Sequence, residues 1–505
     1  MHCVMPNIKV AIYKMVCKSM MMNAEKIIPT VLFSRLFMIV FAIIGDLLIP
    51  DHIPQGADLL LFTEKSSIFL QPFMKWDSIH YLNIARNNYQ LEKQFVFLPG
   101  FPFTVRFLSI TIPFQFIGMS MVDRFVIGAL LLNSVCVIIS CYQLVSILRS
   151  LKIIFTTKDT SLCITIFCFC PASIFFFTGY TEALFSALSW SGLAITFGIS
   201  QQNYLFSKNS WEVVFGLLIS LVSCICLAAA SSVRMNGSLN CVIIIIKYLA
   251  DPIRFKKGKI LYYEELKRML WSSVLCACSS FPGMWWEAVS EKSICIDSSV
   301  TRSERTNHFC NNSRSYPNNS SRYMVPRFQS MYAHLQRQYW NVGFLQYWRW
   351  NQTPNFLLAI PILLISVHAM SGSRLRVNKE RNNHRSIFRV VIYSLSRQVV
   401  HFSPFQFSEF AINRISYFNQ QLSNTLELPT APLQVHLCLL LLIGFFLANV
   451  QITTRLVCSA SPIVYIGFIN VLKYGKQWQR NLCIFYLVIY NIGGILLHCN
   501  FYPWT

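Results

Sequence analysis

Charged residues are scarce in this sequence. They make up 13% of its 505 residues, whereas 54% are hydrophobic, and soluble domains carry about 25% charged residues. Almost uncharged runs of about 20 residues, the length that crosses a hydrocarbon core, recur along the chain. This composition excludes an ordinary soluble domain and predicts a polytopic membrane protein.

Acidic residues are scarcer than basic ones. The sequence has 21 Asp and Glu residues and 43 Lys and Arg residues, which gives a formal net charge of +22. In a soluble protein this charge would suggest a nucleic-acid partner, but no DNA-binding or RNA-binding signature accompanies it, and we expect none. In a membrane protein, Lys and Arg gather in the loops that stay in the cytoplasm. The basic residues here cluster in segments 1–27, 149–158, 254–268, 374–397 and 473–480.

Neither a cleavable signal peptide nor a metal-binding spacing is recognisable. The N-terminus has no apolar run followed by a small-residue cleavage site, so we expect 28–49 to act as an uncleaved signal anchor. The 18 cysteines show no metal-ligand spacing, and we expect no metal site. Cys295 and Cys310 share a polar loop, but the sequence does not decide whether they form a disulfide.

The apolar runs predict an all-α polytopic membrane protein with a bundle of about eleven transmembrane helices, within a range of eight to twelve. Helices are favoured because they satisfy every backbone polar group internally. The runs are 28–49, 122–148, 161–178, 183–199, 212–232, 237–250, 269–286, 354–370, 432–452, 456–472 and 482–499. With eleven crossings, all the basic segments fall on one side, which is then the cytoplasm.

This topology predicts the organisation of the chain. A basic cytoplasmic N-terminus is followed by a transmembrane core, a basic cytoplasmic loop, and C-terminal crossings with a lumenal tail. Lumenal loops interrupt the core, and the first contains amphipathic helices. Glycosylation sequons in the second lumenal loop agree with its side. The expected segments are 1–27, 28–370 with loops 50–121 and 287–353, 371–431, and 432–505, and the sequons are at Asn311, Asn318, Asn319 and Asn351.

Asp77 is the leading candidate for chemistry. It follows Trp76 in "WDSIHYLNIA", just after the first long apolar run, where partial desolvation favours a general base. The alternative is helix capping, because the following residues have the spacing of an amphipathic helix at the interface.

Three more charged residues lie on the predicted lumenal side. Glu182 falls where one apolar run ends and the next begins, so it is either functional or part of a capping box with Thr178. Arg234 is the only basic residue between Trp211 and Lys247, where it either binds phosphate or extends its charge to the interface. Glu92 precedes "QFVFLPGFPF", a turn of aromatic residues and prolines that suits either an aromatic belt or the lining of a site.

Seven blocks of the sequence together resemble a known family. The blocks are "WDSIHYLNIARNNYQLEKQFVFLPGFPF", "PASIFFFTGYTEALFSALSW", "SSVRMNG", "YWNVGFLQYW", "PNFLLAIP", "QITTRL" and "LLHCNFYPWT". In this order, and over nearly the whole chain, they resemble the PIG-V family. Its members are the second mannosyltransferases of glycosylphosphatidylinositol (GPI) anchor assembly, in the lipid-donor GT-C class. The sequence departs from the family pattern at Ile79, where an acid is expected, and at Asn88, where Gly is usual.

The resemblance implies a GT-C-like bundle and an enzyme of the endoplasmic reticulum membrane with a lumenal active face. The implied reaction moves mannose from dolichyl phosphate mannose to the 6-hydroxyl of the first mannose of a GPI precursor, with inversion. Asp77 would be the base, and a basic group such as Arg234 would steady the leaving phosphate. No cofactor or metal is implied. The expected substrate-binding residues are Trp76, His80, Glu92, Glu182, Arg234, Asn236, Trp340, Asn341, His498 and Asn500.

The implied partners are the lipid-linked donor, the GPI-precursor acceptor and the membrane, and the sequence leaves open a small membrane partner subunit. Two alternative functions remain at this stage. One is a multi-pass transporter or lipid scramblase, although no convincing internal repeat supports it. The other is a different dolichol-dependent mannosyltransferase.

Overall fold

A computed structural model describes residues 5–52, 66–111, 119–151, 153, 156–202, 210–254, 261–297, 300, 303–314, 330–371 and 429–503. This part of the chain is built from helices and contains no β-strand. The α-helices are α1 (Met5–Leu48), α2 (Asp77–Asn87), α3 (Gly100–Thr111), α4 (Met121–Ser150), α5 (Thr157–Cys168), α6 (Glu182–Gln202), α7 (Ser210–Val233), α8 (Asn240–Arg254), α9 (Leu261–Glu291), α10 (Glu304–Arg314), α11 (Met331–Trp340), α12 (Thr353–Ser371), α15 (Ala431–Leu442), α16 (Thr453–Ala460), α17 (Val464–Tyr474) and α18 (Gln477–Cys499). Short 3-10 or π-helical segments are η2 (Gln71–Phe73), η3 (Glu92–Val96), η5 (Ser173–Phe176), η7 (Met235–Leu239), η8 (Lys292–Ile296), η9 (Trp350–Gln352), η10 (Ile443–Leu447) and η11 (Val450–Ile452).

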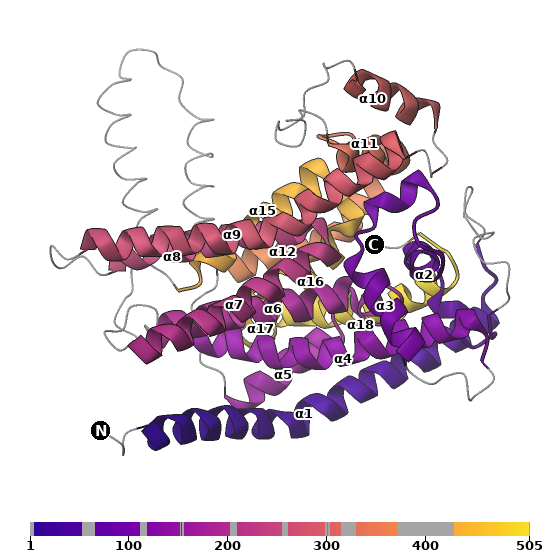
Figure 1. Ribbon diagram of the computed structural model, residues 1–505. Coiled ribbons are helices and arrows are strands. Elements are labelled where there is room, and N and C mark those ends of the chain that lie inside the picture. Colours follow the sequence, from indigo (N-terminus) through magenta and orange to yellow (C-terminus); the bar gives the residue numbers. More distant parts are fainter. Residues whose placement is uncertain are drawn as a thin grey trace, which may run out of the picture.

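The long helices lie side by side in a bundle. Helix α4 packs on α6, α6 on α7, and α7 on α9, while α12 packs on α17 and α1 on α18. The N-terminus and the C-terminus lie at different ends of this bundle, and the shorter helices α2, α3, α10 and α11 gather at the end that holds the C-terminus (Figure 1). The all-α fold predicted from the apolar runs is therefore confirmed for the described residues.

Several helices have the length and composition of membrane spans. Five qualify in the described part of the chain, and α16 and α17 count as a sixth if they are one span bent by 92°. Their outer faces carry exposed apolar residues, for example Leu32, Phe33 and Leu36 of α1, which are 60 to 63% exposed. Such a surface suits lipid. These observations support a multi-span membrane protein, while the number of about eleven crossings stays a prediction.

The segment after α1 turns sharply before α2 begins. Trp76, the residue that precedes the helix, has φ 56° and ψ −133°, in the region that normally favours glycine.

Farther on, Gly100 lies so close to α7 that an added Cβ would meet the backbone of Ser232 at 2.8 Å. The segment "PGFPF", predicted as a turn, instead begins α3, and a glycine at this position lets the start of α3 pack directly against the end of α7.

Some predicted features lie outside the described residues. These are residues 53–65 and 112–118 of the first predicted lumenal loop, most of the basic loop 371–431, and the sequons at Asn318 and Asn319. Asn311 and Asn351 are described, and both are exposed.

Candidate functional site

Asp77 is the first residue of α2, and the N-cap position before it is occupied by Trp76. Its carboxylate Oδ2 instead faces Arg455 of α16, with Nη1 at 3.4 Å and Nη2 at 3.5 Å. The backbone N–H of Asp77 donates to the hydroxyl of Tyr180 at 3.1 Å. The structure therefore disfavours the capping alternative, since the carboxylate points toward a cation from a distant part of the chain.

Glu182 begins α6 and is fully buried. Its Oε1 forms an ion pair with Nη1 of Arg234, which also donates to Thr181 Oγ1 at 3.1 Å. The hydroxyl of Thr178 donates to the Ile174 carbonyl, so it forms no capping box with Glu182. A buried carboxylate paired with arginine avoids the large cost of an isolated charge.

Arg234 is held on both sides. Its Nε donates to Asn236 Oδ1 at 3.3 Å, while its Nη1 is engaged by Glu182 and Thr181. The charge is thus paired inside the protein, and the alternative of a side chain extended toward the membrane interface does not describe this arrangement.

Arg455 joins the two carboxylates. Its Nη1 lies 3.9 Å from Glu182 Oε1 as well as 3.4 Å from Asp77 Oδ2, and its guanidinium lies over the rings of Phe175 and Tyr180. We call Asp77, Glu182, Arg234 and Arg455 the arginine–carboxylate cluster. It brings together α2, α6, α16 and the turn after α7.

Arg455 was not among the site residues predicted from the sequence, although a signal for it was available. It is the only Lys or Arg between 432 and 472, the same criterion that singled out Arg234. It also lies in the block "QITTRL", which contributed to the family resemblance without being assigned a role.

A buried asparagine holds the turn that carries Glu182. The side-chain amide of Asn133, on α4, donates to the carbonyls of Thr178 and Tyr180. Asn133 is fully buried, so these bonds form in a low dielectric where an unpaired carbonyl would be costly. They fix Tyr180 and Glu182 relative to the bundle.

The C-terminal end of α18 lies beside the cluster. His498 is 1% exposed and contacts the rings of Phe175 and Tyr180 edge-on, at centroid distances of 5.4 and 5.5 Å. It therefore supports the same two rings that lie under Arg455. Trp76 packs on Phe501 at 5.9 Å. The amide of Asn500 is used within the tail, donating to the Leu496 carbonyl at 2.7 Å.

His80 and Trp340 are linked through a third ring. His80 stacks on Phe97 at 5.1 Å, and Trp340 meets the same ring edge-on at 5.8 Å. Asn341 follows α11 with φ 53° and ψ 34°, the left-handed conformation that ends many helices. Asn341 therefore ends α11, and its predicted role in substrate binding stays a prediction.

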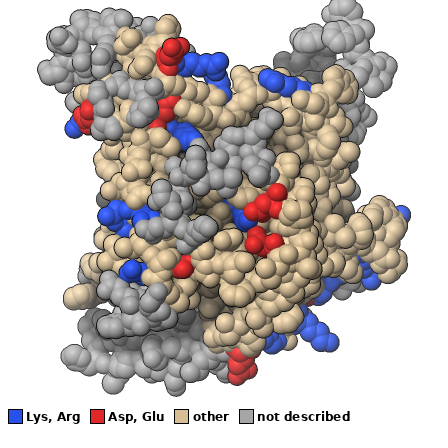
Figure 2. All heavy atoms as spheres, turned by 90° about the vertical axis from the view of Figure 1, so that its right-hand side faces the viewer, with Lys and Arg blue, Asp and Glu red and all other residues tan. Residues whose placement is uncertain are grey.

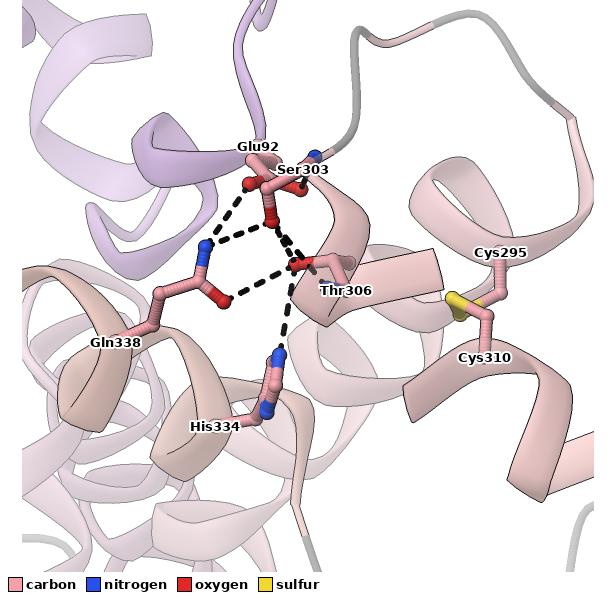
Figure 3. The surroundings of a disulfide bond; sticks show 7 residues. All are labelled: Glu92, Cys295, Ser303, Thr306, Cys310, His334 and Gln338. Atoms are coloured by element: carbon pink, nitrogen blue, oxygen red, sulfur yellow. Dashed lines mark hydrogen bonds between the residues drawn. A yellow bond between two sulfur atoms is a disulfide. The ribbon is translucent and has the colours of Figure 1, made fainter. Parts of the chain in front are cut away.

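Glu92 belongs to a different set of contacts. It is 3% exposed and accepts from the backbone N–H of Ser303, the Gln338 amide and the Tyr339 hydroxyl. Ser303, Thr306, His334 and Gln338 continue this network next to a disulfide between Cys295 and Cys310 (Figure 3). We call Glu92 with Ser303, Thr306, His334, Gln338 and Tyr339 the cap network. Within the described part of the chain, these partners of Glu92 lie outside the arginine–carboxylate cluster, so the structure does not bring Glu92 together with Asp77.

Tyr339 shows the environment of the cap network. Burial, the hydrogen bond to Glu92 and the charge of Glu92 all raise the pKa of its phenol. The phenol therefore stays protonated at neutral pH and serves as a donor to Glu92.

The end of the molecule that carries these groups is mostly uncharged on its surface. In Figure 2, which views that end, acidic and basic side chains appear in small separate groups on a largely tan surface. Among the described residues, no three His, Cys, Asp or Glu side chains are placed to hold a metal ion.

Comparison with known proteins gives a consistent family match. A family model described as "Mannosyltransferase (PIG-V)" matches residues 31–505. Among curated relatives, GPI mannosyltransferase 2 of Drosophila pseudoobscura pseudoobscura is 24% identical over 504 residues, covering 95% of this chain and 100% of the relative. GPI alpha-1,6-mannosyltransferase 2 of Cricetulus griseus is 23% identical, covering 93% of this chain and 96% of the relative. The human protein with the same description is 23% identical, covering 85% and 87%.

A comparison of structures finds a similar arrangement in the Archaeoglobus fulgidus oligosaccharyltransferase. The match has a TM-score of 0.39 and 11% sequence identity, and it covers 93% of this chain and 53% of the other. This chain therefore spans about half the length of that protein.

Proposed function

The chain belongs to the PIG-V family of mannosyltransferases, and on this premise we propose that it adds the second mannose, in α-1,6 linkage, to a GPI precursor. The relatives named GPI alpha-1,6-mannosyltransferase 2 support the linkage and the acceptor class. Dolichyl phosphate mannose is the donor in this proposal. The observation that carries it is the arginine–carboxylate cluster, which lies within the part of the chain that matches the family.

Asp77 is suited to be the proton acceptor. Its side chain is 29% exposed, whereas Glu182 is fully buried, so Asp77 is the carboxylate that an acceptor hydroxyl can reach. The hydroxyl oxygen forms a bond to the anomeric carbon of the donor mannose while the bond from that carbon to the phosphate oxygen breaks. The hydroxyl proton goes to Asp77, and the bonding pair leaves with dolichyl phosphate.

One carboxylate is sufficient for this reaction. Dolichyl phosphate departs as a stable anion, so it needs no proton from a general acid, in contrast to the leaving alcohol of a glycosidase. A guanidinium close to the phosphate stabilises the charge that develops there. Glu182, which lies too deep to meet substrate, orients Arg234 and lies close to Arg455. Attack opposite the leaving group turns a β-linked donor into an α-linked product.

The proposed location is the endoplasmic reticulum membrane, with the cluster facing the lumen. The relatives named as GPI mannosyltransferases support the organelle. The basic segment 473–480 lies at the start of α18, whose other end carries His498 beside the cluster. The positive-inside rule places such segments in the cytoplasm, which favours a lumenal cluster.

The proposal is tested by rescue of cells that lack the family enzyme. Such cells should accumulate a one-mannose GPI precursor, and expression of this chain should convert it to a two-mannose precursor, while an Asp77→Asn variant at equal abundance should not. Purified chain in lipid, supplied with labelled dolichyl phosphate mannose and the one-mannose precursor, should give the same α-1,6 product. A correctly located and abundant chain that leaves the precursor unchanged in both assays would contradict the proposal and favour a transporter or scramblase. A labelled product on a different acceptor would indicate another dolichol-dependent transferase.

A further inference from the structure

We propose that Arg455, rather than Arg234, binds the phosphate of the lipid donor, and that it does so by exchanging Asp77 for that phosphate. This inference rests on the proposed transfer reaction and assigns a substrate-binding role to a residue outside the predicted site. The two arginines share Glu182 as a neighbour, so the difference between them lies in their remaining contacts.

Arg234 already forms hydrogen bonds and an ion pair with groups of the protein. Its Nη1 contacts both Glu182 and Thr181, and its Nε donates to Asn236. Since Glu182 is fully buried, withdrawal of Arg234 would leave an unpaired carboxylate away from water. Such an uncompensated buried charge is strongly unfavourable. Arg234 is therefore anchored where it is.

Arg455 is held more loosely. Its Nη1 and Nη2 both approach the same oxygen of Asp77, at 3.4 and 3.5 Å, and its contact with Glu182 is 3.9 Å. These distances exceed the range of about 2.7–2.9 Å that is typical of charge-assisted hydrogen bonds. Its Nε is buried and has no hydrogen-bond partner among the described residues. The guanidinium thus has donors in reserve for a phosphate.

Asp77 is the partner that Arg455 would release, and it is the carboxylate whose release costs less. Asp77 is partly exposed, whereas Glu182 is not, so Asp77 can lose its cation and remain hydrated. The rings of Phe175 and Tyr180 keep the guanidinium in place, at 5.2 and 5.7 Å from their centroids. These ring contacts do not involve Asp77, so they can persist while the carboxylate contact is exchanged for a phosphate contact.

The charge balance of the reaction supports the exchange. Before transfer, the four cluster residues sum to zero formal charge and the donor phosphodiester contributes one negative charge. During transfer Asp77 gains a proton, and the leaving dolichyl phosphate gains the corresponding negative charge. The total is unchanged, but one negative charge has moved from Asp77 to the phosphate. A guanidinium that reaches both groups stabilises the charge throughout this movement.

Equilibrium binding of a short-chain dolichyl phosphate, in detergent micelles and without any acceptor, tests the exchange. Asp77→Asn should bind this product several-fold more tightly than the wild type, although it transfers no mannose, because Arg455 no longer has a competing carboxylate. Arg455→Gln should bind it about 10- to 100-fold more weakly, and Arg455→Lys should recover part of the loss. In the double variant Asp77→Asn/Arg455→Gln, the tightening should disappear. Arg106→Gln, which removes an arginine paired with Asn88, is the matched control and should not change binding.

Two results would overturn the role of Arg455. One is unchanged affinity of Asp77→Asn for dolichyl phosphate. The other is tightening that persists in the double variant, since removal of negative charge alone would then explain it. Asp77→Asn keeps the shape of the side chain and leaves Arg455 in place. Its affinity for dolichyl phosphate therefore tests the proposal even if Arg455→Gln does not fold. Failure of the proposed function is distinguished by the wild type, which would then transfer no mannose from dolichyl phosphate mannose whatever the variants bind.

Discussion

Glu182 and Glu92 are buried to nearly the same degree, at 0% and 3% exposure, but their partners are of different kinds. Glu182 pairs with Arg234 and lies near Arg455. Glu92 accepts hydrogen bonds from neutral donors supplied by Ser303, Gln338 and Tyr339. Neutral donors satisfy a carboxylate and join the segments that supply them, but they leave no cation for an anionic substrate. Burial alone therefore does not distinguish an acid that positions arginines from an acid that only joins segments of the chain, whereas the charge of its partners does.

The largest expected effect follows from Asp77→Asn. The amide keeps the size of the carboxylate but cannot accept the hydroxyl proton, so turnover should fall about 100- to 10,000-fold, the usual contribution of a general base. Turnover of purified protein with labelled donor measures the effect, and the elution profile of the detergent-solubilised protein checks its folding. Near-normal turnover would remove Asp77 from the chemistry and weaken the contrast with the cap network.

Glu182→Gln and Glu92→Gln test the comparison directly. The first removes the buried carboxylate that pairs with Arg234, and loss of one partner of a buried ion pair costs about 3–5 kcal/mol. The second keeps an acceptor for neutral donors and should cost about 1–2 kcal/mol. Thermal unfolding in detergent measures both. Equal destabilisation would mean that the charge of the partners makes no difference.

Removal of the disulfide should affect the cap network alone. The two cysteines are 15 residues apart, and the chain-entropy model gives about 3 kcal/mol for a loop of that length. Replacement of Cys295 and Cys310 by Ser should therefore increase protease cleavage near 295–314. The KM for the donor should stay within about twofold of the wild type. A large rise in the donor KM would show that the cap network and the cluster act as one unit.

The smallest expected effect follows from a change at the end of α2, outside both the arginine–carboxylate cluster and the cap network. Asn88 has φ 60° and ψ −168°, a conformation that costs a non-glycine residue about 1–3 kcal/mol, and the family resemblance places Gly there. Asn88→Gly should relieve this strain but lose the hydrogen bond from Arg106. We expect a net stabilisation of about 1 kcal/mol or less, seen as a slightly higher midpoint of thermal unfolding. A lower midpoint would show that the bond to Arg106 outweighs the strain.

Local sequence signals predicted the local features well. The charge content predicted a multi-span helical protein, and the spacing after Asp77 predicted a helix that the structure forms as α2. Asp77, Glu182 and Arg234 were each chosen because they are charged residues in or beside apolar runs, where an ionisable group is a candidate for function. The structure places these three residues in one cluster with Arg455.

The pairing of these charges could not be read from the sequence. Asp77 and Arg455 are 378 positions apart, and no local pattern connects them. The same limit explains why Glu92 was predicted to lie in one site with Asp77. The residues that donate hydrogen bonds to Glu92 lie 211 to 247 positions away in the sequence. Asn341 was predicted to bind substrate through the family resemblance, and its left-handed backbone adds a role in ending α11 that no local pattern indicated.

The bend between α16 and α17 determines where the arginine sits in the bilayer. Helix α17 has 11 residues, so it rises only about 16 Å, roughly half of a hydrocarbon layer of about 30 Å. If α17 begins at the cytoplasmic edge of that layer, α16, which turns away at 92°, lies about midway through it and carries Arg455 at that depth. A phosphate held there could stay joined to a polyprenyl tail that remains among the lipid chains, so catalysis would not require the donor to be lifted out of its leaflet.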